Sequence, residues 1–269
     1  MTDSPQPPPA VVHAVLFDLD GVLTPTAEVH MRAWAALFTD YLGRRGLTPD
    51  YTDDDYFAYV DGKPRYDGVR SLLASRGVTL PEGDPTDPPT AETVCGLGNR
   101  KNAEFATLLA TEGVAAYPGS VALLDDLETR GIAMAVVSSS ANARDVLAAA
   151  GLGDRFGVVV DGLVAREHAI AGKPAPDTYA YGAAQLGVPS RASVVVEDAV
   201  SGVQAGAAGD FALVVGVDRG AGADVLRSHG ADVVVTDLAE LVGVLGVSIA
   251  RPARGSTDDG TDDRSGGAA

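Results

Sequence analysis

The sequence of 269 residues contains one cysteine, Cys95. A single cysteine excludes an internal disulfide and argues against a thiolate metal cluster, so we expect Cys95 to be a small core or near-surface residue and not a nucleophile. Long apolar runs are also missing. The longest candidates, at 132–137 and 241–250, are far shorter than the roughly 20 residues that span a bilayer, so no membrane segment is predicted.

Positive charge is scarce, because 20 lysines and arginines stand against 37 aspartates and glutamates, for a formal net charge of −17. Nucleic-acid phosphates require a basic surface, so this balance argues against a nucleic-acid partner. An anionic substrate would need a local group of cations. Residues 1–9 are proline-rich and lack the basic and apolar regions of a secretory signal, which favours the cytoplasm.

A hydrophobic fraction of 46% is enough for a well-buried core. The two ends of the chain differ from this average. Residues 1–10 are expected to be a disordered arm, and residues 251–269, rich in Gly, Ser, Thr and Asp, a disordered acidic tail.

Residues 27–113 show helical spacing at 27–42, 66–75 and 103–111 and no clear buried strand. On either side of this segment the pattern is different, with apolar strand candidates that alternate with helices. The strand candidates after the segment lie at 133–138, 158–161, 193–197, 213–217 and 232–235, and the helix candidates lie at 120–129, 143–150, 177–186, 201–208, 221–228 and 238–245.

This alternation predicts an α/β fold with a doubly wound, Rossmann-like parallel sheet. The core comprises 11–26 and 114–250, and 27–113 form an inserted all-helical cap domain.

The apolar run at 11–17 ends in Asp18 and Asp20, followed by Gly21. Continuous apolar residues suit a central parallel strand, and ligands of open α/β sheets collect beyond the carboxyl ends of such strands. The period of two along a strand would point both carboxylates the same way. A plain turn is the alternative for so short a motif, whereas a calcium loop is excluded because its first and last positions would be Leu16 and Ala27.

Three later stretches place polar side chains at equivalent strand ends. Ser138 to Ser140 follow one apolar run and precede a helix start, where hydroxyls and free amides can bind an anion or simply cap the helix. Lys173 lies between a glycine and two prolines and is either a fixed cation or a surface charge. Glu197 and Asp198 end another apolar run, and buried acids are costly unless they bind a cation.

Other phosphate-binding motifs are absent: the sequence has no Gly-x-x-x-x-Gly-Lys-Ser/Thr, no complete dinucleotide fingerprint and no Gly-x-Ser-x-Gly. What remains is an aspartate nucleophile, a second acid, a hydroxyl, a lysine and a carboxylate pair for a hard divalent cation. These groups together suit phosphoryl transfer through an aspartyl-phosphate.

Four motifs in this order resemble the haloacid dehalogenase superfamily. They are Asp-x-Asp-Gly-Val-x-Thr at 18–24, Val-Val-Ser at 136–138, Gly-Lys-Pro-Ala-Pro-Asp at 172–177 and Val-Glu-Asp-Ala-x-x-Gly at 196–202. The resemblance implies that Asp18 is phosphorylated and that Asp20 is the general acid and base. It also implies that Ser138 and Lys173 hold the phosphoryl oxygens and that Mg²⁺ is bound by Asp18, by the backbone carbonyl of Asp20, and by Glu197 and Asp198.

The insert is similar to the helical cap of the β-phosphoglucomutase branch of this superfamily. The similar segments lie at 26–34, 62–65 and 98–102, and the core contributes a Ser-x-Ser-x-Asn segment at 138–142. The resemblance implies that the far phosphate of the substrate is held by the arginine and by the serine-rich segment. The implied substrate-binding residues are His30, Trp34, Arg65, Lys101, Ser140 and Asn142.

Packing on a shared helix face is the alternative for His30 and Trp34, which are four residues apart. Two positions depart from the pattern of the branch: Pro25 replaces the usual aspartate, and Ala141 stands where the better-known mutases have lysine. Both departures concern the affinity for the distal phosphate.

The expected function is a magnesium-dependent phosphosugar mutase that converts β-glucose 1-phosphate to glucose 6-phosphate through a sugar bisphosphate. A sugar-phosphate phosphatase, in which water attacks the same aspartyl-phosphate, is the nearest alternative. A non-catalytic phosphosugar-binding protein is a third hypothesis, and a dehalogenase would leave Asp20 and magnesium without a role. We expect a monomer whose partner is a small phosphosugar.

Overall fold

The computed structural model describes residues 11–245, so the arm and tail expected at 1–10 and 251–269 lie outside the described residues. Within this range no helix is both long and apolar enough to cross a membrane. Six strands form one sheet: β1 (Ala14–Phe17), β2 (Ala133–Val137), β3 (Val158–Val160), β4 (Ser193–Glu197), β5 (Leu213–Val217) and β6 (Val233–Val235).

The sheet is entirely parallel, with the strand order β3-β2-β1-β4-β5-β6. Strand β1 lies in the middle, with Phe17 in register with Val136 of β2 and Val196 of β4. Because parallel strands share one carboxyl edge, the residues that follow these three positions lie beside one another. This register is what brings Asp18, Ser138 and Glu197 to one edge of the sheet.

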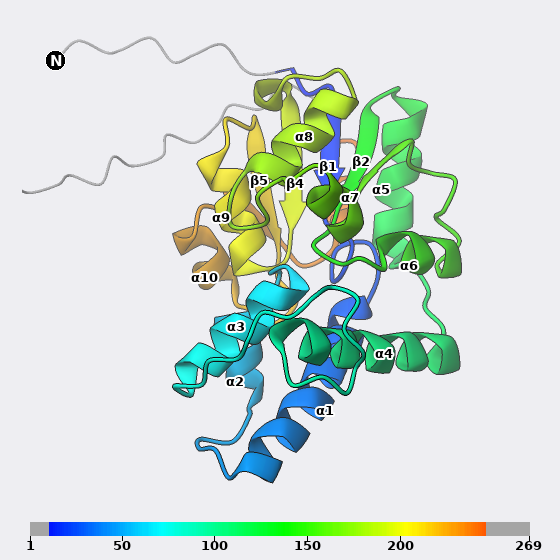
Figure 1. Ribbon diagram of the computed structural model, residues 1–269. Coiled ribbons are helices and arrows are strands. Elements are labelled where there is room, and N and C mark those ends of the chain that lie inside the picture. Colours follow the sequence, from blue (N-terminus) through cyan, green and yellow to red (C-terminus); the bar gives the residue numbers. More distant parts are fainter. Residues whose placement is uncertain (1–10, 246–269) are drawn as a thin grey trace, which may run out of the picture.

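Helices cover both faces of the sheet, as Figure 1 shows. Val15 and Phe17 of β1 pack with helices on one face, and Leu16 packs with helices on the other, which explains why every residue of this strand is apolar. The core helices are α5 (Pro118–Thr129), α6 (Ala143–Ala149), α7 (Gly162–Glu167), α8 (Asp177–Gln185), α9 (Val200–Ala208), α10 (Ala223–Ser228), and the 3₁₀ helices η2 (Ser190–Ala192) and η3 (Leu238–Leu241).

The inserted segment is a helical cap that lies beyond the carboxyl edge of the sheet (Figure 1). It has a hydrophobic cluster of its own, in which Trp34, Phe38 and Leu72 are among the buried residues, and Cys95 is buried nearby. The cap consists of α1 (Thr26–Arg45), α2 (Asp53–Asp55), the π-helix η1 (Tyr56–Val60), α3 (Arg65–Ser75) and α4 (Val94–Glu112). We propose that residues 27–113 form a separate cap domain inserted in the core at 11–26 and 114–250.

The structure confirms the predicted sheet and cap and corrects several element boundaries. The helix expected at 238–245 is only the short η3, which ends before Gly243, a residue with a φ of 74°. The helix expected at 103–111 is the second half of the longer α4, so the motif at 98–102 is helical. The first strand begins at Ala14 and not at 11, and Val11 is exposed. Helices α7 and η1 were not expected.

Candidate active site

Asp18 directly follows β1 and is buried at the carboxyl edge of the sheet. Its backbone amide donates to the carbonyl of Val196 at 2.9 Å, which continues the ladder between β1 and β4 by one residue. Gly21 then turns the chain away with a φ of 84°. A Cβ atom at this position would lie 1.9 Å from Oδ2 of Asp198, so a side chain here would collide with the late acidic pair.

Lys173 connects the ends of three strands. Its ammonium donates to Oδ1 of Asp18 at 2.5 Å, to Oε1 of Glu197 at 2.6 Å and to the carbonyl of Val137 at 3.0 Å. Burial opposes a charge here, but the carboxylates of Asp18 and Glu197 outweigh it and raise the pKa of Lys173. Lys173 is therefore a fixed buried cation and not a surface charge.

Asp18, Glu197 and Asp198 form a buried carboxylate cluster in which one oxygen from each residue lies within 4.8 Å of the others. Glu197 already accepts hydrogen bonds from Lys173, from the Tyr179 hydroxyl at 3.0 Å and from the Ala199 amide at 3.0 Å.

The carboxylate of Asp198 accepts no hydrogen bond from any residue in 11–245, and burial together with the nearby acids Asp61 and Glu197 raises its pKa. Such uncompensated negative charge fits a hard divalent cation with oxygen ligands. The carboxylate of Asp20 is outside this cluster.

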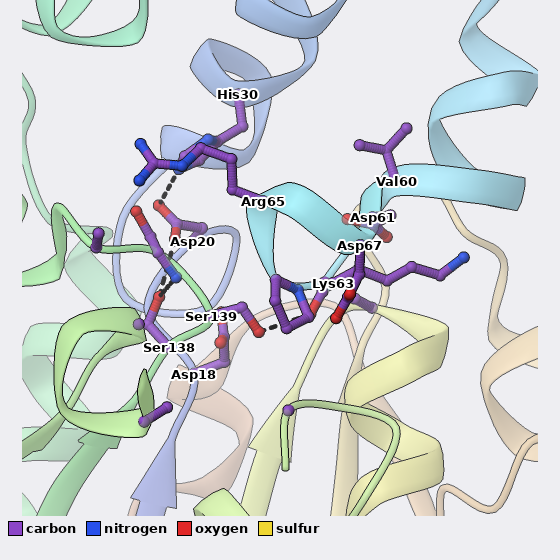
Figure 2. A pocket seen from close by; sticks show the side chains of 18 of the residues that line it. Asp18, Asp20, His30, Val60, Asp61, Lys63, Arg65, Asp67, Ser138 and Ser139 are labelled. Atoms are coloured by element: carbon purple, nitrogen blue, oxygen red, sulfur yellow. Dashed lines mark hydrogen bonds and ion pairs between the residues drawn. The ribbon is translucent and has the colours of Figure 1, made fainter. Parts of the chain in front are cut away.

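The carboxylate of Asp20 points toward the cap, as Figure 2 shows. It accepts from the Thr26 hydroxyl at 2.5 Å and from the Ser138 hydroxyl at 3.3 Å, and Nε2 of His30 lies 3.4 Å away. Burial would raise the pKa of Asp20, but His30 and the Thr26 hydrogen bond lower it to about 2. Asp20 is therefore ionised at neutral pH, although its environment differs from that of Asp18 two residues earlier.

A buried Lys101 and a mostly buried His30 form a pair on the cap side of Asp20. The Lys101 ammonium contacts Nδ1 of His30 and lies 5.0 Å from the Trp34 ring and 4.9 Å from the Phe105 ring. Burial lowers the pKa of Lys101 to about 7, and burial with the Lys101 charge lowers the pKa of His30. Trp34 also stacks on Phe38, so this residue both packs within the cap and faces the site.

A cavity of about 320 Å³ lies between the cap and the core, which is a volume typical of small-molecule sites. Its lining brings together all but one of the residues predicted from the sequence: Asp18, Asp20, His30, Trp34, Arg65, Lys101, Ser138, Ser140, Asn142, Glu197 and Asp198. The exception is Lys173, which reaches the site through its bond to Asp18.

The serine-rich segment is held by its own hydrogen bonds. The Ser138 hydroxyl accepts from the Ser140 amide at 3.0 Å, and the Ser140 hydroxyl accepts from the Asn142 amide at 3.1 Å. These bonds are the local caps that serine commonly makes. The Ser138 hydroxyl also donates to Asp20, so it joins this segment to the catalytic edge.

Three further polar contacts around the cavity join cap and core, in addition to those of Asp20 with Thr26 and His30 of α1. The Ser139 hydroxyl donates to the Gly62 carbonyl at 2.7 Å, and the Ser201 hydroxyl donates to the Asp61 carbonyl at 3.0 Å. The side-chain amide of Asn142 donates to the side-chain oxygen of Asn102 at 2.7 Å. The cap is therefore closed over the strand ends in this structure, a position that limits the access of water to the cavity.

Sequence reasoning missed Asp61, Tyr179 and Arg166. Asp61 lines the cavity beside Gly62, and burial raises its pKa to about 7. Tyr179 donates to Glu197 from α8, and Arg166 lines the cavity from α7. Asp61 adjoins the Gly-Lys-Pro-Arg segment that the resemblance singled out, and this position is the one signal in the sequence that could have identified it as a site residue. Tyr179 and Arg166 lie in no motif.

A family model described as haloacid dehalogenase-like hydrolase matches residues 12–210. The chain belongs to this family. The match extends from β1 through the cap to α9, so it includes all four core motifs. This membership makes the chain an enzyme of the phosphotransferase or phosphatase type, in a family that generally uses a divalent metal.

Curated relatives within the haloacid dehalogenase-like hydrolases include both mutases and a phosphatase. A β-phosphoglucomutase of Mycobacterium tuberculosis is 54% identical over 244 residues, which cover 87% of this chain and 93% of the relative. Hexitol phosphatase A of Escherichia coli is 33% identical over 236 residues, with coverage of 84% and 91%. A solved β-phosphoglucomutase of Clostridium difficile has the same fold, with a TM-score of 0.69, 24% identity and coverage of 86% and 93%.

The environment of Asp61 generates a prediction about stability. Its pKa of about 7 in the folded protein lies above the ordinary value of 3.8, so the metal-free protein loses stability as the pH rises from about 4 to about 7. Asp61→Asn removes this loss. The free energy of unfolding of Asp61→Asn, relative to that of the parent, should rise between pH 5 and pH 8 by up to about 3 kcal/mol.

Urea unfolding in the presence of a chelator at both pH values measures this difference. Asp54→Asn is the matched control, because Asp54 is an exposed acid of the same cap. If the free energies of unfolding of Asp61→Asn and the parent differ by the same amount at both pH values, the raised pKa of Asp61 is contradicted.

Proposed function

We propose that this enzyme is a magnesium-dependent phosphosugar mutase that converts β-glucose 1-phosphate to glucose 6-phosphate through a sugar bisphosphate. The observation that carries the proposal is a cavity between cap and core with a nucleophile at the core end and Arg65 on the cap side. The 54% identity to the mycobacterial β-phosphoglucomutase supports the same reaction.

In this proposal Asp18 is the nucleophile. Lys173 engages its Oδ1, which leaves the other carboxylate oxygen to accept the phosphoryl group, and the Lys173 charge offsets the negative charge that accumulates. Asp18, Glu197 and Asp198 would hold Mg²⁺, with the Asp20 carbonyl as the further ligand that the resemblance implies. When bound, Mg²⁺ supplies positive charge that neutralises these carboxylates and the phosphoryl oxygens.

Asp20 is the proposed proton carrier. When phospho-Asp18 gives its phosphoryl group to a sugar hydroxyl, Asp20 takes the hydroxyl proton and a sugar bisphosphate forms. The bisphosphate then presents its other phosphate to Asp18, and Asp20 returns the proton to the oxygen that leaves. The low pKa of Asp20 keeps it ionised for the first step, and the Thr26 and His30 contacts that lower it must loosen when the sugar hydroxyl arrives.

Arg65 is the proposed cap ligand for the phosphate that is not reacting. It begins α3, its stem passes close to Gly98 of α4, and its guanidinium lies 5.1 Å from the Tyr66 ring. A Cβ atom at Gly98 would lie 2.7 Å from the Tyr66 ring and 3.1 Å from Cγ of Arg65, so Gly98 leaves room for both side chains. The planar fork of arginine suits phosphate oxygens.

A sugar-phosphate phosphatase is the second candidate. It is favoured by the 33% identity to hexitol phosphatase A and by Ala141, which supplies no cation to the cavity. In this case water would attack phospho-Asp18 after the sugar has left.

The two functions separate in one assay. With β-glucose 1-phosphate, Mg²⁺ and a trace of glucose 1,6-bisphosphate, we expect glucose 6-phosphate to form at least tenfold faster than free phosphate is released. Coupled reduction of a nicotinamide cofactor measures the first product, and a colorimetric assay measures the second. Phosphate release without isomer conversion would show that the phosphatase is the better assignment.

Arg65→Ala should lower the rate of isomer conversion at least tenfold, which corresponds to about 1.4 kcal/mol of transition-state stabilisation. Binding at the distal phosphate also holds the cap closed, so the release of free phosphate should fall much less or rise. The ratio of glucose 6-phosphate to phosphate is the quantity to measure. Arg44→Ala is the matched control, because Arg44 is an exposed cap arginine paired with Asp40. An equal fall in both activities would mean that Arg65 only supports the fold.

A further inference from the structure

Two arginines that line the cavity have no acidic partner. Among residues 11–245, no carboxylate lies within 4.0 Å of the guanidinium of Arg65 or of Arg166. By contrast, Arg70 also lines the cavity and pairs with Asp67 and Glu82. In a chain with 37 acidic and 20 basic residues, two unpaired arginines at one cavity are free to bind an anion.

The fold places Arg166 beside the serine-rich segment. The amide of Gly162, the first residue of α7, donates to the Ser140 carbonyl at 3.0 Å. A Cβ atom at Gly162 would lie 2.7 Å from the Ser139 carbonyl oxygen, so α7 begins in close contact with that segment. Arg166 follows one helical turn later, and Ala165 next to it also lines the cavity. The side of the cavity near Ser140 therefore includes a cation that comes from α7.

Arg65 and Arg166 come from opposite sides of the cavity. Arg65 belongs to the cap, and Arg166 is the one basic residue that the described core contributes to the lining. Burial lowers the pKa of Arg65, and the charge of Arg166 lowers it further, which indicates that the two guanidiniums lie close enough to repel each other. An anion between them would relieve this repulsion.

We propose that Arg65 and Arg166 form a two-arginine clamp, one residue from the cap and one from the core, for the phosphate of a sugar bisphosphate that is not being transferred. This inference rests on the proposed mutase function and deepens it. A phosphate has enough oxygens to accept hydrogen bonds from both guanidiniums. Because the two residues belong to different parts of the structure, a phosphate between them also favours the closed position of the cap. Ala141 then needs no cationic side chain.

The ordinary alternative is that Arg166 is a solvated charge in the last turn of α7, where it interacts with the helix dipole. A phosphate ligand and a helix-terminal charge differ in one respect. Only the ligand role makes the affinity for a bisphosphate depend on Arg166 while the chemistry at Asp18 stays intact.

The test compares bisphosphate binding with a reaction that needs no second phosphate. Binding of glucose 1,6-bisphosphate is measured by calorimetry in an Asp18→Asn background, which prevents turnover. Hydrolysis of acetyl phosphate, which carries a single phosphate, is measured with Asp18 present. Arg166→Ala should weaken bisphosphate binding at least tenfold and change acetyl phosphate hydrolysis by less than twofold. Arg166→Lys keeps the charge but not the planar fork of the guanidinium. Its affinity for the bisphosphate should lie between that of the parent and that of Arg166→Ala.

Arg191→Ala is the matched control, since Arg191 is an exposed arginine of the core that does not line the cavity. A fall in affinity of less than tenfold in Arg166→Ala, or one equal to that of Arg191→Ala, would overturn the clamp. Equal losses of binding and hydrolysis would also overturn it, because they would indicate a structural role. If the parent binds the bisphosphate but does not convert β-glucose 1-phosphate, the mutase proposal fails while the comparison still decides the role of Arg166.

Discussion

One buried ammonium group holds this active site together. Lys173 bonds to residues at the ends of β1, β2 and β4, and two of its three partners are carboxylates. Without a cation at this point, Asp18 and Glu197 would be like charges buried side by side, an arrangement that is strongly unfavourable. Lys173 therefore allows several acidic side chains to lie together at the sheet edge, where their carboxylates can bind a divalent cation.

Much of the fold followed from the sequence because local pattern and tertiary environment agree. The strands are apolar throughout because both faces of the sheet are covered, and Asp18 and Glu197 interrupt that pattern at the point where each strand ends. Because the parallel strands share one carboxyl edge, distant motifs could be placed together without knowing the paths of the loops. For this reason the residues of the catalytic edge were predictable individually, while the cap boundaries were predictable only approximately.

The rest of the site depends on packing between segments that carry no local signal. The carboxylate of Asp20 was expected to point the same way as that of Asp18, but it contacts Thr26 and His30 of α1 and lies in a different environment. The segment at 238–245 has helical spacing, yet only η3 forms before the left-handed backbone at Gly243 ends the turn. Arg166 lies on a six-residue helix whose position depends on contact with Ser139 and Ser140, which no periodicity reveals. Ala141, by contrast, was visible as a departure, and Arg166 is the nearby cation that we propose compensates for it.

The claim on which the account depends is that the phosphoryl group passes through Asp18 inside a closed cavity. The most direct measurement is a single-turnover reaction with ³²P-labelled glucose 1,6-bisphosphate, quenched in acid, followed by reduction of the acyl-phosphate and mass spectrometry of the peptides. The account predicts transient label and modification at Asp18, together with the formation of glucose 1-phosphate and glucose 6-phosphate. Formation of both sugar phosphates with no label on Asp18 at any time would contradict it.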